Sequence, residues 1–206
     1  MPRHSGEPGS RSILTSPDAG ASLAAGGHVH ISRAGQEILV RRLLPIDREQ
    51  LAAGYQELSL AARRARFGSP PDQLSSRELD QLLDLDFDDR FALGAVVADE
   101  SGERGVGVAR YSRRNDDPTT AEAAVVVLDA YQHRGIGTLL LWDLVAAARD
   151  HGITTFTATV RWESSWLLDA IRAAGAAVHP SEPGVAAVTF QLPDLPADVD
   201  RAEDAS

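Results

Sequence analysis

The 206-residue sequence contains no cysteine and no lysine. Without cysteine the chain forms no disulfide, and it offers no thiolate as a metal ligand or as a nucleophile. All 20 basic residues are arginine, and against 30 acidic residues they leave a formal net charge of −10 at pH 7. Because nucleic acids attract cationic surfaces, this charge argues against a nucleic-acid partner and favours a cationic one.

Long apolar runs are also missing from the sequence. No stretch reaches the roughly 18 consecutive apolar residues of a membrane span, and the first residues, MPRHSGEPGSRS, lack the apolar core of a signal peptide. We therefore expect no membrane association and a cytoplasmic location. The composition, with 43% hydrophobic and 24% charged residues, is that of one globular domain.

Both ends of the chain have the composition of flexible tails. Residues 1–27 are rich in Gly, Ser, Pro and Ala without helical or strand periodicity, and residues 194–206 hold five acidic residues and one arginine. We predict a flexible N-terminal tail over residues 1–36, a single domain over residues 37–193, and an acidic flexible tail over residues 194–206.

Hydrophobic periodicity predicts the element order βααβββαβαβ within that domain. We expect strands over residues 37–45, 91–99, 105–113, 122–130, 154–160 and 185–192, and helices over residues 47–67, 75–83, 138–152 and 163–175. Ser75 followed by Glu78 forms a capping box at the start of the second helix. This order calls for an α/β fold with a central mixed β-sheet flanked by about four helices.

The most informative segment is the turn of residues 132–137, with the sequence QHRGIG, between a strand and a long helix. Its glycines let the backbone approach a ligand closely, and the helix N-terminus presents free N–H groups and the positive end of its dipole. Such a turn binds phosphate or pyrophosphate. It is neither a P-loop, which needs a lysine, nor a dinucleotide fingerprint, which needs glycine where Leu140 stands.

Gln132, Gly135 and Gly137 match the pattern (Gln/Arg)-x-x-Gly-x-(Gly/Ala), and the segment resembles the acyl-CoA-binding turn of the GCN5-related N-acetyltransferase (GNAT) family. The preceding strand, the following Leu-rich helix, and a later strand and helix agree with that family, so the resemblance covers residues 38–192. It implies one GNAT-like domain that binds acetyl-CoA between two splayed central strands. The resemblance also implies acetyl transfer to an amine by direct attack, without a covalent enzyme intermediate.

The resemblance further implies which residues hold the co-substrate. They belong to the end of the strand, the turn and the start of the helix, namely Val126, Val127, Gln132, His133, Arg134, Gly135, Ile136, Gly137 and Thr138. Ser164 is expected to contact the pantetheine arm, at a position where the family often has asparagine. Its hydroxyl can still donate or accept one hydrogen bond.

Glu122 occupies, by the same resemblance, the position of the general base. An alkyl ammonium has a pKa of about 10.4, and the amine attacks a thioester only after losing its proton. A carboxylate takes that proton when burial raises its pKa, or when a water relay passes the proton to solvent. The other interpretation of Glu122 is a solvated acid at a strand edge.

Residues 62–97 and 121–141 resemble the catalytic domain of bacterial protein lysine acetyltransferases that modify acyl-CoA synthetases. We therefore expect a protein lysine as the acetyl acceptor, with two alternatives: a small-molecule amine, or a non-catalytic module that senses acyl-CoA. Either a monomer or a homodimer fits the sequence. The acidic residues Asp84, Asp86, Asp88 and Asp89 either meet a basic protein substrate or form a solvated loop.

The histidines are scattered along the sequence. His28, His30, His151 and His179 show no second ligand at the spacing typical of metal sites. We therefore expect no metal ion, and acetyl-CoA is the only expected cofactor.

Overall fold

Eight strands form one sheet in the computed structural model, which describes residues 26–32, 35–67, 70–99, 102–161, 168, 171–172 and 175–193. The strands are β1 (His28–Ile31), β2 (Glu37–Arg42), β3 (Arg90–Asp99), β4 (Gly102–Arg113), β5 (Thr120–Val127), β6 (Thr155–Arg161), β7 (Ala177–Pro180) and β8 (Val185–Gln191). The helices are η1 (Pro45–Asp47), α2 (Arg48–Glu57), α3 (Leu60–Phe67), α4 (Ser76–Leu83), η2 (Asp129–Tyr131) and α5 (Ile136–Asp150), where η marks a 3-10 helix.

The strand order is β1-β2-β3-β4-β5-β6-β8-β7. Only β5 and β6 pair in parallel, and all other neighbouring strands are antiparallel. The parallel pair is joined by α5, as a crossover between parallel strands requires. The predicted mixed sheet is thus confirmed.

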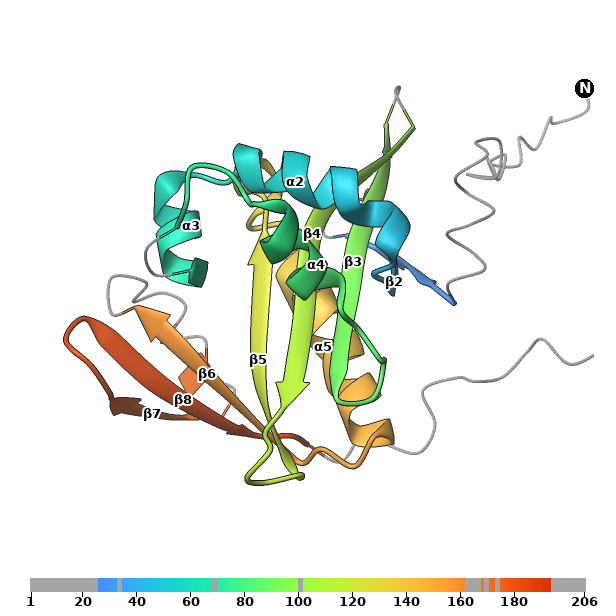
Figure 1. Cartoon of the computed structure of the whole chain (residues 1–206). Helices are drawn as coiled ribbons and strands as arrows, with labels where there is room; N and C mark the ends of the chain where they lie inside the picture. Colours follow the sequence, from blue (N-terminus) through green and yellow to red (C-terminus); the bar gives the residue numbers. More distant parts are fainter. Residues whose placement is uncertain are drawn as a thin grey trace, which may run out of the picture.

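Helices cover both faces of the sheet: α2 and α4 lie on one face and α5 lies on the other (Figure 1). The sequence of β3 reflects this arrangement, because all seven residues from Phe91 to Val97 are buried. A strand buried on both faces is expected to be continuously apolar, whereas a strand with one wet face alternates. None of the helices in the described ranges is long and apolar enough to cross a membrane.

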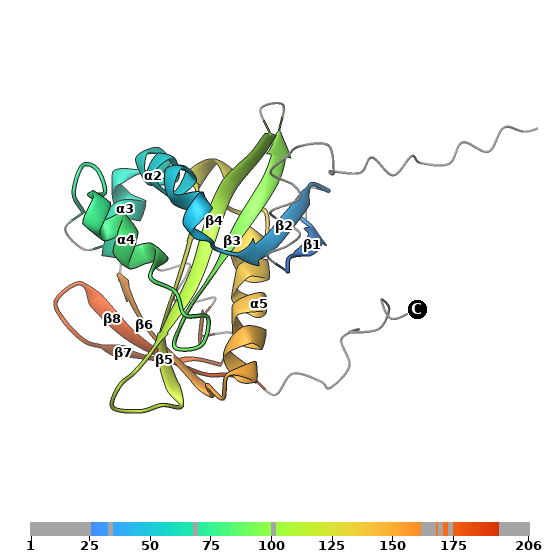
Figure 2. The ribbon, with the colours of Figure 1, turned by 45° about the vertical axis from the view of Figure 1, so that its right-hand side comes forward.

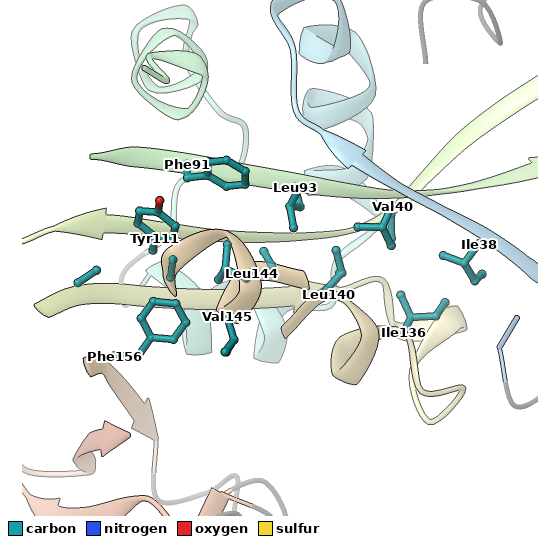
Figure 3. Close-up of a cluster of buried hydrophobic side chains, with 14 of the residues drawn as sticks. Ile38, Val40, Phe91, Leu93, Tyr111, Ile136, Leu140, Leu144, Val145 and Phe156 are labelled. Carbon is teal, nitrogen blue, oxygen red and sulfur yellow. The ribbon is translucent and has the colours of Figure 1, made fainter. Parts of the chain in front are cut away.

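The main core lies between α5 and strands β2 to β5 (Figure 3). Helix α5 contributes residues that recur every three or four positions and are at most 1% exposed, namely Ile136, Leu140, Leu144, Val145 and Ala148. Each fully buried Leu, Ile or Val side chain stabilises the fold by about 1.5–3 kcal/mol. The helix axis is therefore held firmly against the sheet.

Aromatic rings close the core near the C-terminal end of α5 (Figure 3). The rings of Phe91 and Tyr111 stack at 5.5 Å with an interplanar angle of 8°, and the Phe156 ring lies 6.0 Å from that of Tyr111. The Tyr111 hydroxyl donates a hydrogen bond to the Asp88 carbonyl at 2.9 Å. Burial raises the pKa of Tyr111 far above its usual value, so this hydroxyl stays protonated.

Two strands were not expected from the sequence. β1 lies within residues 1–36, the predicted flexible tail, and β7 precedes β8. Both are four residues long and lie at the two ends of the sheet, where pairing with a longer neighbour makes the strand. The predicted domain start at residue 37 therefore leaves out β1. Residues 1–25 and 194–206 lie outside the described part of the chain, and their description as tails stays a prediction.

The first predicted helix is also different in the structure. One helix was expected over residues 47–67, but α2 ends at Glu57 and Leu58 is extended, with φ −67° and ψ 135°. α3 then starts at Leu60, with the Ser59 hydroxyl accepting the Ala62 N–H at 3.2 Å. The capping box of α4 is confirmed. The helix predicted over residues 163–175 lies mostly outside the described residues, although Leu168 is buried in a small cluster with residues of β8.

A buried ion pair fixes the start of α2 to the sheet. The Arg41 guanidinium on β2 donates to both carboxylate oxygens of Asp47, at 2.8 and 2.7 Å, and the Leu44 N–H also donates to Asp47 at 2.7 Å. Both side chains are about 5% exposed. The hydrogen bond with Asp47 raises the pKa of Arg41, so the guanidinium remains charged inside the protein.

Replacing Asp47 with alanine leaves the Arg41 charge buried without its carboxylate. We expect Asp47→Ala to lower the free energy of unfolding by about 3–5 kcal/mol, because removing one partner of a buried ion pair leaves the other uncompensated. Urea unfolding followed by circular dichroism measures this change. The control is Asp80→Ala, which removes an exposed partner of Arg48 and should cost less than about 1 kcal/mol. Equal losses in the two variants would contradict the prediction.

Candidate active site

The turn that follows β5 has an unusual backbone path. His133 has φ +61° and Gly135 has φ +87°, and α5 begins at the next residue. The N–H groups of Thr138 and Leu139 both donate to the Gly135 carbonyl, at 3.0 and 3.1 Å. Helix geometry leaves the N–H groups of the two residues before Thr138 without an acceptor inside α5.

Those two N–H groups belong to Ile136 and Gly137, at the positive end of the dipole of a 15-residue helix. A Cβ placed on Gly137 would lie 3.7 Å from the nearest Val127 carbon and 4.0 Å from the nearest Val125 carbon, which are ordinary van der Waals contacts. Position 137 therefore has room for a small side chain against β5. The arrangement suits a phosphate or pyrophosphate.

The polar side chains of the turn hold its shape. Gln132 Nε2 donates to the Val127 carbonyl at 3.1 Å and to Asp129 Oδ1 at 3.2 Å. Arg134 donates to the Ala130 carbonyl at 2.8 Å, and its guanidinium lies 4.9 Å from the centre of the Tyr131 ring. Both side chains bond to residues 127–130, at the end of β5 and in η2, and so stabilise the backbone path of the turn. The His133 side chain is exposed.

Strands β5 and β6 pair over only three residues. Their ladder runs from Thr120 to Glu122 on β5, opposite residues 155–157 of β6, and the two strands then diverge (Figure 1). The other edge of β5 remains paired, since Val126 lies opposite Val108 of β4 and Val127 opposite Gly107. The β5 edge that faces β6 beyond Glu122 has no ladder partner among the described residues. On this edge the Val127 carbonyl accepts the Gln132 side-chain amide, and the remaining backbone groups are available to a ligand.

Glu122 is the last β5 residue paired with β6, and its side chain is exposed. Side chains alternate along a strand, so Glu122 shares a sheet face with Ala124 and Val126. Those two residues line a cavity of about 110 Å³ between α2, α4 and strands β3 to β5. The carboxylate thus stands beside the point of strand separation, on the cavity side, in contact with water.

Asp129 links the turn after β5 to the start of helix α3. Its Oδ2 accepts the Ser59 N–H at 2.8 Å, its Oδ1 accepts the Ser59 hydroxyl at 3.2 Å, and its Oδ1 also accepts the Gln132 amide. Ser59 is the residue immediately before α3, so these contacts hold the break between α2 and α3. Sequence reasoning missed Asp129, because its partner lies 70 positions away.

The acidic residues that follow α4 form ion pairs with two arginines. Arg90 pairs with Asp84 at 2.7 Å and with Asp86 at 3.1 Å, and Arg113 pairs with Asp88 and Asp89. These four acids are therefore engaged in ion pairs within the protein, and their side chains remain 39–69% exposed. Ser164 lies outside the described residues, and its expected role stays a prediction.

The histidines are less scattered in space than in sequence. His151 Nδ1 lies 3.0 Å from the Tyr111 hydroxyl and 2.8 Å from the Ala147 carbonyl, at the end of α5. His28 and His30 lie together beside Asp143, a grouping that sequence spacing did not predict. It is separate from the turn of residues 132–137.

Comparison with known families identifies residues 56–164 as matching the acetyltransferase (GNAT) family. Two curated relatives are similar to the chain. Acetyltransferase PA5475 of Pseudomonas aeruginosa is 34% identical over 118 residues, which are 57% of this chain and 63% of the relative. Acetyltransferase Pat of Mycolicibacterium smegmatis is 30% identical over 170 residues, which are 79% of this chain and 48% of the relative. The chain therefore spans less than two thirds of either relative.

Among solved structures, the GNAT domain of S. lividans PAT has a similar fold. The TM-score is 0.73 at 29% sequence identity, and the match covers 81% of this chain and 97% of that domain. The fold expected from the resemblance of residues 38–192 is thus confirmed.

The contacts of Asp129 predict a measurable effect on the turn. We expect Asp129→Ala to lower the free energy of unfolding by about 0.5–2 kcal/mol, the range for losing a helix cap, and to speed hydrogen exchange of the amides in residues 132–137. The exposed carboxylate of Asp116, which pairs with Arg114, supplies the control variant Asp116→Ala. If exchange in the turn were equal in the two variants, Asp129 would not hold the turn.

Proposed function

Because the chain belongs to the acetyltransferase (GNAT) family, we propose that it is an N-acetyltransferase that passes the acetyl group of acetyl-CoA to an amine, with a protein lysine as the acceptor. One observation carries this proposal: the three-residue pairing of β5 and β6 opens a gap between the strands. The phosphate-binding turn lies at the end of β5 and the exposed Glu122 lies where the gap begins. A long, phosphate-bearing thioester and an amine can both reach this place.

The turn fits the pyrophosphate of acetyl-CoA. Backbone N–H groups of Ile136 and Gly137 would donate to its oxygens, with the dipole of α5 adding positive potential. Gly135 supplies the left-handed conformation that starts the helix at this point. Val127 would serve through its backbone N–H on the β5 edge that faces the gap, since its carbonyl accepts from Gln132. Val126 would serve through its side chain, since its backbone pairs with Val108 of β4.

Acetyl-CoA supplies a thioester whose carbonyl carbon the amine attacks, so that a C–N bond forms, the C–S bond breaks and CoA leaves as a thiolate. The attacking amine must first lose a proton. Glu122 is the carboxylate at the strand separation, and its exposure favours a route in which water carries that proton to Glu122 or on to solvent. Neither a metal ion nor a covalent enzyme intermediate is needed for this balance.

Tyrosine hydroxyls are natural donors of the proton that the thiolate needs. Tyr111 is fully buried and its hydroxyl is bonded to the Asp88 carbonyl, and the Tyr55 hydroxyl donates to the Pro71 carbonyl at 2.5 Å. Tyr131 ends η2 just before the turn, and its half-buried ring lies 5.7 Å from the Arg104 guanidinium and 4.9 Å from that of Arg134. Solvent reaching the exposed gap is a sufficient source of the proton.

A protein lysine is the proposed acceptor for two reasons. Residues 62–97 and 121–141 resemble bacterial protein lysine acetyltransferases, and relatives of this chain carry the names Pat and PAT. The exposed position of Glu122 also suits an acceptor that extends one long side chain from a folded surface. A small amine remains the alternative acceptor.

We expect Glu122→Gln to keep the affinity for acetyl-CoA and to lower turnover by about 10²- to 10⁴-fold, the usual contribution of a general base. Glutamine preserves the size of the side chain and removes the proton acceptor. Calorimetry measures the affinity, and thiol release with an amine acceptor measures turnover. Glu182→Gln, which changes an exposed acid in the turn between β7 and β8, should change neither quantity. Unchanged turnover of Glu122→Gln, with chemistry shown to be rate-limiting, would contradict the role of Glu122.

The acceptor is tested with the same pair of variants in cells. Acetylated lysines that are present with the unmodified enzyme and lost with Glu122→Gln would support a protein acceptor. An unchanged set of acetylated lysines, together with rapid acetylation of small amines in vitro, would favour the alternative. Acetyl-CoA binding without turnover on any amine would mean a sensing module rather than an enzyme.

Two substitutions at position 137 distinguish a loss of folding from a loss of acetyl-CoA binding. Alanine there meets only ordinary van der Waals contacts, with its Cβ 3.7 Å from Val127, so Gly137→Ala should fold and bind acetyl-CoA. Gly137→Leu adds a large side chain at the first turn of α5, where a Cβ already contacts Val127 and Val125, and should abolish binding. In calorimetry, a hundredfold excess of acetyl-CoA over its dissociation constant should stabilise the unmodified chain and Gly137→Ala by about 2.7 kcal/mol and should not stabilise Gly137→Leu. Equal binding by all three would show that the ligand lies elsewhere.

A further inference from the structure

Two histidines of β1 face the same side of the sheet. β1 is the end strand and pairs antiparallel with β2, with His28 opposite Val40 and His30 opposite Ile38. Residues opposite each other in such a pair project to the same face. Val40 and Ile38 are buried in the core against α5, so both imidazoles project to the α5 side of the sheet. The ribbon of β1 runs beside α5 (Figure 2).

Asp143 on α5 meets these histidines. It precedes the fully buried Leu144 and follows Leu140 by three positions, so it lies at the border of the buried face of the helix. His30 Nε2 lies 2.8 Å from Asp143 Oδ2, and the two side chains are 26% and 19% exposed. The His28 ring stands at right angles to the His30 ring, with 6.4 Å between their centres.

One ligand atom from each of the three side chains lies within 4.8 Å of the other two. We propose that His28, His30 and Asp143 form a zinc site with a fourth position open to water. Two imidazole nitrogens and one carboxylate oxygen are a ligand set that zinc accepts, and ligands about 2.0–2.2 Å from a tetrahedral ion lie about 3.3 Å from one another. The His30–Asp143 pair is already that close, and the exposed His28 side chain closes the rest by rotation.

The competing interpretation is a hydrogen bond between His30 and Asp143 that needs no ion. Both interpretations require His30 and Asp143, but only the zinc site requires His28. The spacing of the two histidines supports the zinc site, because residues i and i+2 of a strand project to the same face of the sheet. His28 is therefore the residue that distinguishes the two.

The zinc site ties the end strand to the helix that carries the phosphate-binding turn. β1 is paired on one edge, to β2, and its other side chains Val29 and Ile31 are 55% and 62% exposed. An ion shared between β1 and α5 adds an attachment across the core face. Since zinc binds the assembled site and not the unfolded chain, it stabilises the fold by mass action. This inference does not rest on the proposed acetyl transfer.

The test uses the full chain freed of metal with a chelator and titrated with Zn²⁺ by calorimetry, with bound zinc counted after dialysis. We expect one Zn²⁺ per chain and a melting temperature that rises with Zn²⁺ but not with Mg²⁺, which prefers oxygen ligands. His28→Ala and Asp143→Asn should each weaken Zn²⁺ binding by at least about tenfold, since losing even an outer-shell partner costs about 10- to 100-fold.

The matched control is His179→Ala, which removes an exposed histidine from β7 at the opposite end of the sheet and should bind Zn²⁺ like the unmodified chain. Melting curves without metal establish that each variant is folded, and His28 is exposed, so its replacement leaves the core intact. Zinc affinity unchanged by His28→Ala would overturn the proposal and leave the hydrogen bond as the explanation. Absence of Zn²⁺ binding by the unmodified chain would overturn it as well.

Discussion

Helix α5 buries Ile136, Leu140 and Leu144 completely against strands β2 to β5, and the other features of the candidate site depend on this contact. Close packing of these side chains fixes both the axis of the helix and its rotation about that axis. The free N–H groups at its first turn consequently point to one place at the end of β5. A phosphate-binding turn on a loosely held helix would lack this preorganisation, and ordering it would reduce the affinity for the ligand.

The separation of β5 from β6 is the second feature on which the candidate site depends. α5 connects these parallel strands, and their ladder is limited to Thr120–Glu122 on β5. Beyond it the backbone of β5 stays paired with β4 on one edge, and the other edge has no ladder partner among the described residues. Asp129 then links the end of β5 to the start of α3 through Ser59. The turn is thus held from the sheet, from α5 and from the helices on the opposite face.

Three parts of α5 have different roles. Its N-terminus follows the turn of residues 132–137, its middle carries Asp143 beside the histidines of β1, and its C-terminal end meets the Tyr111 ring cluster through His151. All three parts adjoin the one buried face of α5. The packing of that face against the sheet therefore places groups that lie far apart along the chain. Charged side chains outside the candidate site also bond within the protein. The acidic residues after α4 form ion pairs with Arg90 and Arg113.

The sequence by itself determined the order of the longer elements, the α/β class and the turn of residues 132–137. These features follow from local causes: the period of apolar residues, the Ser75–Glu78 capping box and the glycines before a long helix. Tertiary structure decided the strands β1 and β7, the break between α2 and α3, and the grouping of His28 and His30 with Asp143. Each of these needs a partner distant in sequence, such as Asp129 for Ser59. Periodicity describes which face of an element is apolar, but only the packing of elements decides which polar groups meet across the chain.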